Sequence, residues 1–230
     1  MRIIFSLFII LATLCISPSV FARGGGHAFG GGLIISSPPQ DNLDSVVDSV
    51  NASQSVAVGK FGGAYEFFGH YSYRFSGSMF ALQFRPSYFT QSTDGNGREI
   101  SLTGFSFYPI LRLYPLENNF IKFFLQAGLG YGQLNGEMSD GGGKIEFSGG
   151  SFGALGGLGA EFCFTKNHCM VVEGNLRYNP IVRNVVDSKT GSPDFDLSQD
   201  GKGQELEFAN GDLQTTLSGI QGAISYTFAF

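Results

Sequence analysis

Hydrophobic and polar residues alternate along most of the chain, and the alternation is clearest near its end. In residues 214–230, Ile220, Ile224 and Tyr226 fall on one face, while small and polar side chains fall on the other. A repeat of two residues is typical of a β-strand, because successive side chains point to opposite faces of a sheet. Seven earlier segments show the same repeat, the first of them weakly: residues 26–36, 63–75, 79–90, 101–114, 120–134, 151–164 and 168–180.

The connections between these eight predicted strands alternate between short and long. Short turns on one side of a barrel and long loops on the other are typical of outer-membrane proteins. The pattern therefore predicts an all-β fold, an eight-stranded antiparallel up-and-down transmembrane β-barrel. The short connections are residues 76–78, 115–119 and 165–167, and the long ones are residues 37–62, 91–100, 135–150 and 181–213.

One face of each predicted strand is bulky and aromatic, and the other mixes charged, amide and glycine residues. The interior of an eight-stranded barrel is barely wide enough for its own side chains. We therefore expect the aromatic face to contact lipid. Lipid also requires a closed barrel, because no unpaired strand edge can be hydrated there. A soluble β-sandwich with an aromatic core is the alternative, since its strands alternate as well.

Composition favours strands over helices. The 230 residues include 34 glycines and 24 phenylalanines, and 14% are charged, well below the usual quarter. Glycine costs about 1 kcal/mol at a helical position. After residue 22, no apolar run reaches the ~20 residues that a helical membrane span needs. The net charge of −5 disfavours nucleic acid as a partner, because nucleic acid requires a basic surface.

The first 22 residues are predicted to be an export signal. A positive start, an apolar run over residues 3–16 and a small residue, Ala22, follow the order of a signal peptide. The apolar run is too short for a membrane anchor. Lipidation of Cys15 is disfavoured because the bulky Leu14 precedes it. The expected barrel domain is therefore residues 23–230.

The end of the chain carries a second signal. Tyr226, Phe228 and Phe230 alternate with smaller residues. This ending resembles the assembly signal of outer-membrane proteins, which implies the barrel-assembly machinery as a partner. The expected barrel domain resembles the small eight-stranded families typified by OmpA, OmpX and OmpW, and the resemblance implies a bacterial outer-membrane location. Residues 111–132 and 156–168 also resemble porin-like outer-membrane proteins of predatory bacteria, a group thought to form oligomers that enclose lipid.

Charged side chains on the predicted inner face are expected to pair inside the barrel, because an enclosed charge is costly when unpaired. Lys122 and Glu161 lie on neighbouring predicted strands and are expected to pair. Glu173 is expected to meet Arg112 or Arg85. The cluster could line an ion path or plug the barrel, and a plug is favoured because eight strands leave little room for water. Its predicted members are Glu66, Arg74, Arg85, Arg112, Lys122, Glu161, Glu173 and Arg177.

Two cysteines remain after removal of the export signal. Cys163 and Cys169 flank a connection of five residues, share a strand face and are placed symmetrically about the turn. Opposed strand residues can approach to about 4.5 Å between Cα atoms, which a disulfide accepts. An exported chain meets oxidising conditions, so a disulfide is favoured over two free thiols. His168 is adjacent, but no fourth ligand is evident, and we expect no metal or cofactor.

The first long connection is expected to contain a short amphipathic helix over residues 40–52. Leu43, Val46, Val47 and Val50 follow helical spacing, and acidic residues occupy the other sides. The helix could pack over its own barrel, close the mouth, or contact a neighbouring subunit or another partner.

The last long connection, residues 181–213, is strongly acidic. Its spacing matches no established cation loop, so a solvated surface is favoured over a Ca²⁺ site. Its acidic residues are Asp187, Asp194, Asp196, Asp200, Glu205, Glu207 and Asp212.

The pattern favours a non-enzymatic barrel with a structural or interaction role in the envelope. Ala154, Gly156 and Ala160 would leave a flat lipid-facing strip where another barrel could approach. We therefore expect a homo-oligomer, with outer-membrane lipid as a partner and lipid held between protomers. The alternatives are a channel for ions or hydrophobic solutes and a lipid-modifying enzyme. An enzyme is disfavoured because His70, Ser72 and Glu66 share a polar face without forming a recognisable triad.

Overall fold

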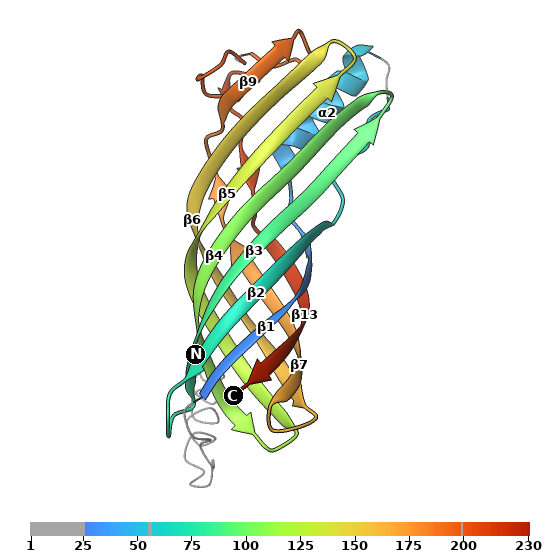
Figure 1. Ribbon diagram of the computed structural model, residues 1–230. Coiled ribbons are helices and arrows are strands. Elements are labelled where there is room, and N and C mark those ends of the chain that lie inside the picture. Colours follow the sequence, from blue (N-terminus) through green and yellow to red (C-terminus); the bar gives the residue numbers. More distant parts are fainter. Residues whose placement is uncertain (1–25, 55–56, 199) are drawn as a thin grey trace, which may run out of the picture.

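The computed structural model describes residues 26–54, 57–198 and 200–230, so the predicted export signal lies outside the described residues. Eight antiparallel strands pair in a closed ring in the order β1, β2, β3, β4, β5, β6, β7 and β13 (Figure 1). The predicted barrel is confirmed. The strand bounds are β1 Gly26–Ser37, β2 Ala64–Arg74, β3 Phe80–Gly95, β4 Arg98–Glu117, β5 Ile121–Asp140, β6 Gly143–Cys163, β7 His168–Tyr178 and β13 Gly219–Ala229.

The apolar face of these strands points outward, as expected for a barrel in lipid. Exposed and buried residues alternate strictly along β7 after its first residue. Phe152 and Leu129 are 84% and 73% exposed, values that a soluble core would not tolerate. Several aromatic side chains are exceptions and lie inside, including Phe68, Tyr108, Tyr114 and Phe124.

Four strands are much longer than a bilayer requires. A transmembrane strand needs about 9–11 residues, whereas β4, β5 and β6 contain 20, 20 and 21. They and β3 continue past the other four strands (Figure 1). The predicted loops at residues 91–100 and 135–150 are therefore wrong, since these residues form two strand hairpins with short turns.

The polarity of the two strand faces inverts where the long strands leave the barrel. In the membrane part of β5 the outward residues include Leu129 and Tyr131, and beyond it they are polar, such as Asn135. The inward residues change in the opposite direction, from Gln126 to Leu134. This inversion marks where the strands leave the membrane on the side of the extended hairpins, because apolar outward residues suit lipid and polar ones suit water.

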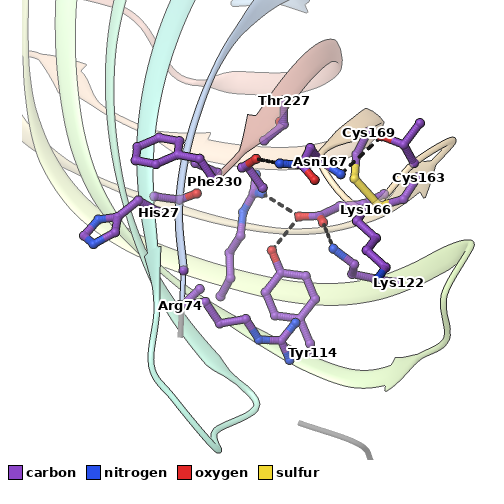
Figure 2. Close-up of a pocket in the computed structure, with 18 of the residues that line it drawn as sticks. His27, Arg74, Tyr114, Lys122, Cys163, Lys166, Asn167, Cys169, Thr227 and Phe230 are labelled. Carbon is purple, nitrogen blue, oxygen red and sulfur yellow. Dashed lines mark hydrogen bonds and ion pairs between the residues drawn. A yellow bond between two sulfur atoms is a disulfide. The ribbon is translucent and has the colours of Figure 1, made fainter. Parts of the chain in front are cut away.

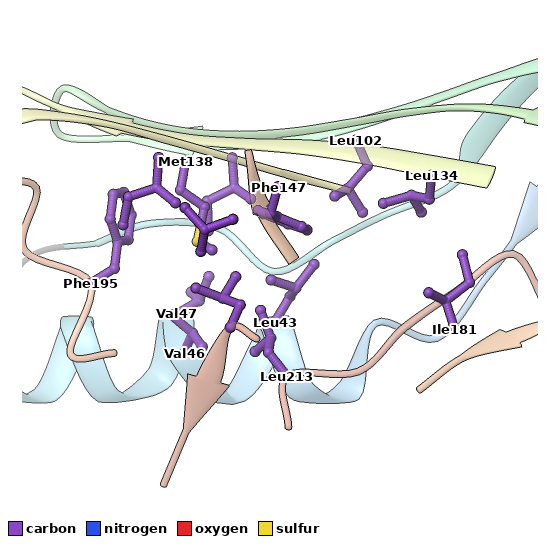
Figure 3. Close-up of a cluster of buried hydrophobic side chains, with 14 of the residues drawn as sticks. Leu43, Val46, Val47, Leu102, Leu134, Met138, Phe147, Ile181, Phe195 and Leu213 are labelled. Atoms are coloured by element: carbon purple, nitrogen blue, oxygen red, sulfur yellow. The ribbon is translucent and has the colours of Figure 1, made fainter. Parts of the chain in front are cut away.

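A helix fills the trough formed by the extended strands. Helix α2 spans Asp41–Gln54, close to the predicted 40–52, and lies against the inner side of these strands (Figures 1 and 3). We call its buried cluster the cap core. Its members are Leu43, Val46, Val47, Val50, Val58, Ala64, Phe89, Ile100, Leu102, Leu134, Met138, Ile145, Phe147, Ile181, Val186, Phe195, Leu206, Leu213 and Leu217.

The last long connection is also more ordered than predicted. Strand β9, Val185–Gly191, pairs with the start of β6 and widens the extended sheet. The remaining short strands are β8 Pro180–Ile181, β10 Glu207–Phe208, β11 Gly211–Asp212 and β12 Thr215–Thr216. The cap therefore consists of α2, the extended ends of β3 to β6, and residues 180–217. Within the described residues, no helix is long and apolar enough to cross a membrane.

Glycine in β1 allows the barrel to close tightly around large interior side chains. A Cβ atom at Gly30 would lie 2.3 Å from the backbone oxygen of Tyr226 and 2.4 Å from the ring of His70. Contacts this short do not occur between real atoms, so only glycine fits there. The weak alternation of the first strand thus reflects close packing in the lumen.

Candidate functional site: the filled lumen and its periplasmic cavity

The middle of the lumen is organised around the carboxylate of Glu173, which projects inward from β7. Arg85 Nη2 donates to both of its oxygens at 2.7 and 2.8 Å, Arg112 Nη2 also donates to it, and Gln126 donates at 2.9 Å. Sequence reasoning offered Arg112 or Arg85 as its partner, and the structure brings both to it. One carboxylate therefore connects β7 to three other strands, β3, β4 and β5.

A second carboxylate, Glu161, lies nearer the periplasmic end. It accepts hydrogen bonds from the Tyr114 hydroxyl at 2.5 Å and from Lys122 Nζ at 3.2 Å, the pairing expected from the sequence. Arg112 Nη1 approaches it at 3.5 Å and so links it to Glu173. These groups form one connected layer of buried charge.

A separate ion pair fills the outer part of the lumen. Arg177 Nη1 donates to both oxygens of Glu66 at 2.9 Å, and both side chains are 1% exposed. Ser87 also donates to Glu66. The cap core begins on the extracellular side of this pair. The buried charged groups and the cap core therefore follow one another along the axis of the barrel.

The remaining predicted charge, Arg74, has a partner that sequence reasoning missed. Its guanidinium donates to both oxygens of Glu117, at 2.6 and 2.9 Å. Glu117 was assigned to a turn because the strand was expected to end at residue 114. A register irregularity between Leu113 and Leu116 changes the alternation and returns Glu117 to the lumen.

Aromatic rings pack against the buried guanidinium groups. Arg112 lies over Phe124 at 4.2 Å from the ring centroid, and Arg85 lies over Phe68 at 4.8 Å. Such contacts stabilise a buried cation, which matters most for Arg85 because its Nε and Nη1 have no hydrogen-bond partner among the described residues. The inward position of both rings follows from the strand alternation and could have been read from it.

The Cys163 and Cys169 side chains form a disulfide across the β6–β7 hairpin, with their Cα atoms 3.9 Å apart. The two residues are directly opposed in the strand register, as their sequence symmetry indicates. Both sulfur atoms lie near the carboxylate of Glu161. Because the cysteines are joined to each other, they do not act as metal ligands in this state.

A cavity of about 680 Å³ lies at the periplasmic end of the lumen (Figure 2). Residues from all eight barrel strands line it, and Lys166 and Asn167 of the β6–β7 turn lie at its rim. Figure 2 shows the Tyr114 hydroxyl and the Lys122 ammonium group directed to a common acceptor, which is Glu161. The cavity is thus lined by both charged and apolar side chains at the periplasmic end of the barrel.

The three residues considered for catalysis, Glu66, His70 and Ser72, have different neighbours in the structure. Glu66 is engaged by Arg177, and His70 Nε2 lies 3.2 Å from the Thr227 hydroxyl. Ser72 lies at the periplasmic cavity instead. Within the described residues, His70, Ser72 and Glu66 therefore do not form a nucleophile–base–carboxylate chain.

Ala154, Gly156 and Ala160 face outward on β6, on the lipid side. They lie beside other small positions, because Gly156 is opposite Ala127 of β5 in the strand register. Two more glycines, Gly174 and Gly222, are paired on β7 and β13, and no atom lies within 4 Å of a Cβ placed on either. Small outward residues are therefore concentrated on this side, where they alternate with large ones such as Leu158 and Leu176.

The three residues of the predicted assembly signal also face outward. Phe228 and Phe230 have ring centroids 6.3 Å apart, and Phe230 stacks on Phe29 of β1 at 5.7 Å. Tyr226 contacts the ring of His168 on β7. The last strand therefore joins both neighbours through aromatic contacts near the periplasmic boundary.

The acidic residues of the last connection are mostly at the surface, as expected for a solvated region. Asp200 pairs with Lys189, and Asp196 accepts a 2.5 Å hydrogen bond from Ser49 of α2. Arg183 pairs with Glu205 at 3.2 Å. The two ion pairs stabilise the connection internally, and the hydrogen bond from Ser49 attaches it to α2.

A closed antiparallel barrel with an aromatic lipid-facing surface and a charged interior defines a transmembrane β-barrel of the bacterial outer membrane. The sequence profile of the family described as "Outer membrane protein beta-barrel domain" matches residues 8–228. The chain therefore belongs to this family. The outer-membrane location and the resemblance to small eight-stranded barrels are both confirmed.

The chain is similar to several solved outer-membrane proteins. The outer membrane protein OprG from Pseudomonas aeruginosa is 12% identical, with a TM-score of 0.58 over 91% of this chain and 97% of that one. Ail, the attachment invasion locus protein of Yersinia pestis, is 12% identical, with a TM-score of 0.47 over 90% and 100%. The outer membrane protease OmpT from Escherichia coli is 8% identical, with a TM-score of 0.43 over 94% and 100%. No curated protein sequence matches the chain.

Proposed function

We propose that this protein is a non-enzymatic, closed barrel that anchors its rigid extracellular cap in the outer membrane and presents the cap for interaction. The observation that carries the proposal is the filling of the barrel. Glu66 and Glu173 hold arginines from opposite strands across the lumen, and the cap core occupies the space above them. A barrel filled in this way is suited to structure and contact more than to solute passage.

The cap supports an interaction role because it is built as a folded unit. Helix α2 is held by buried apolar contacts. Gln40, which directly precedes the helix, donates a hydrogen bond of 2.8 Å from its side chain to the backbone oxygen of Thr216. A preorganised surface loses little conformational entropy when it binds. This favours the cap over a flexible loop as a platform for a partner.

The closed state is tested by conductance. Purified protein is inserted into planar bilayers, and swelling of protein-containing liposomes is measured in small sugars, with a general porin as the positive control. We expect no conductance steps and no swelling above those of protein-free membranes. Reproducible conductance steps or sugar-dependent swelling would overturn the closed-barrel proposal in favour of the transport alternative.

The proposal includes self-association through the β6 side of the barrel, with lipid held between protomers. Ala154, Gly156 and Ala160 are small outward positions on β6, on either side of the exposed Leu158. Gly174 and Gly222 add two further outward positions without a side chain. Small residues let two membrane proteins approach closely, so that van der Waals contact and trapped acyl chains can stabilise the assembly.

Native mass spectrometry of detergent-extracted protein tests this part. We expect an oligomer that retains lipid, and Gly156→Leu should shift it toward the monomer because a large side chain separates the strips. The matched control is Gly69→Leu, an outward glycine on β2, which stands opposite β6 in the ring. A wild-type monomer free of lipid, or an equal effect of both variants, would refute association through this face.

A further inference from the structure

The ion pairs of the lumen do not balance, and the imbalance lies next to the periplasmic cavity. Apart from His70, the lumen ion pairs among the described residues join five cationic side chains to four carboxylate side chains, which leaves one positive side-chain charge in excess. Glu66 neutralises Arg177 and Glu117 neutralises Arg74, so the excess belongs to the middle layer. That layer contains Arg85, Arg112 and Lys122 with Glu161 and Glu173.

Lys122 is the member of this layer that can meet a further ligand. Arg85 does not line the cavity. Arg112 does, but Gln126, Glu161 and Glu173 accept from its three guanidinium nitrogens, so Lys122 is the lining cation of this layer with donors to spare. Its Nζ makes one hydrogen bond, to Glu161, and an ammonium group carries three N–H donors. Glu161 also accepts a hydrogen bond from Tyr114 and pairs with Arg112. Its single negative charge is therefore not available to Lys122 in full.

The cavity around Lys122 is suited to an anion. At about 680 Å³ it falls in the range of small-molecule sites. A second lysine, Lys166, lies at its rim, and Asn119, Asn167 and Ser72 add amide and hydroxyl groups. Its walls stand in a low-dielectric membrane, where a surplus charge is weakly screened and costly to leave uncompensated.

We propose that the periplasmic cavity binds an oxyanion, the carboxylate or phosphate group of a small periplasmic solute, with Lys122 as the principal contact and Lys166 as the second. The bound anion supplies the counter-charge that the lumen lacks. This site is independent of the closed-lumen proposal, because its lining residues lie at the periplasmic end and binding requires no passage through the barrel.

Titration calorimetry of the full-length folded protein, with inorganic phosphate and succinate as separate probes and chloride at matched ionic strength, tests the proposal. We expect saturable binding of at least one oxyanion and none of chloride in the same range. Phosphate and succinate separate the two sources of the oxyanion. Absence of saturable binding by both probes, or equal binding of chloride, would overturn the proposal.

Three variants locate the site. Lys122→Gln should weaken binding about tenfold or more because it removes the charged contact. It should still fold, since Glu161 keeps Tyr114 and Arg112 and the layer becomes electrically balanced. Lys166→Gln, in an exposed turn, should weaken binding severalfold. Lys144→Gln, a partly exposed lysine of the cap, is the control and should bind as wild type.

The variants also provide a result that would refute the location. If Lys122→Gln and Lys166→Gln both bind phosphate and succinate as tightly as the control, the cavity is not the site. Folding is checked by the heat-dependent shift in gel mobility of the barrel. Because Lys166 is exposed at a turn, its variant reports on binding even if Lys122→Gln fails to fold.

Discussion

The Glu66–Arg177 ion pair allows the sharpest test of the lumen network. It is a one-to-one pair, with two 2.9 Å hydrogen bonds and both side chains 1% exposed. Glu66→Gln keeps the shape but leaves a buried guanidinium without its counter-charge. Removing one partner of a buried pair costs about 3–5 kcal/mol. We expect the free energy of unfolding to fall by that amount.

The double variant Glu66→Met with Arg177→Met separates loss of pairing from loss of packing. Replacing both members of a buried pair by apolar residues is often nearly neutral. The double variant should therefore recover most of the loss caused by Glu66→Gln. The control is Glu146→Gln, which breaks an exposed pair with Lys144 in the cap and should cost less than about 1 kcal/mol.

Urea unfolding in phospholipid vesicles is the assay, followed by far-UV circular dichroism and by gel mobility of the folded barrel. Intrinsic tryptophan fluorescence is not an option because the chain contains no tryptophan. A loss below about 1 kcal/mol for Glu66→Gln would contradict the energetic role assigned to the pair. A double variant no more stable than the single one would contradict it too.

Three further predictions concern the cap and the periplasmic hairpin. Leu43→Ala should lower the free energy of unfolding by about 2–5 kcal/mol in the same assay, because Leu43 is fully buried in the cap core. Replacing Cys163 and Cys169 by serine should cost about 2 kcal/mol, the chain entropy of a short closed loop, and reduction should reproduce the effect. Burial alone would raise the pKa of Asp140. Hydrogen bonds from backbone N–H groups, including that of Asp194, together lower it by more, so the pKa lies below its ordinary value of 3.8. The Asp140 carboxylate therefore stabilises the cap fully above pH 3.8, where it is ionised. As the pH falls below 3.8 through the lowered pKa of the folded state, hydrogen-exchange protection at the β5–β6 turn should decrease. Asp140→Asn should abolish that dependence.

The barrel itself could be predicted because its physics is local to each strand. Alternation in residues 168–180 and 214–230 assigns each side chain to lipid or lumen without knowledge of its partners. The same parity placed Lys122 and Glu161 on adjacent inner faces, where the structure joins them. The symmetry of Cys163 and Cys169 about their turn likewise fixed their opposition.

The extended hairpins were missed because the polarity rule changes sign outside the bilayer. Beyond Tyr131 a polar residue faces out and an apolar one faces in, so the strand reads as an interruption of the pattern. One signal was present, because Asn96 and Gly97 are an Asn-Gly pair and both adopt positive φ in the β3–β4 turn. The register irregularity before Glu117 had no comparable sequence signal.

The cap could not be predicted in detail because its contacts join distant parts of the chain. The spacing of Leu43 and Val46 indicates an amphipathic helix, but most of the cluster that covers them comes from residues 89–217. The cavity at Lys122 depends in the same way on the simultaneous position of all eight strands.

The position of α2 in the chain has a consequence for the order of assembly. Gln40 contacts Gln91 and also Thr216, which follows it by 176 residues, directly before the last strand. Contacts of such long range form slowly, because a large loop must close before they contribute. The helix is made early in synthesis but cannot reach its final environment until the ring is nearly complete. Maturation of the protein should thus end with docking of α2, and a kinetic intermediate should contain a formed ring whose outer trough is still open.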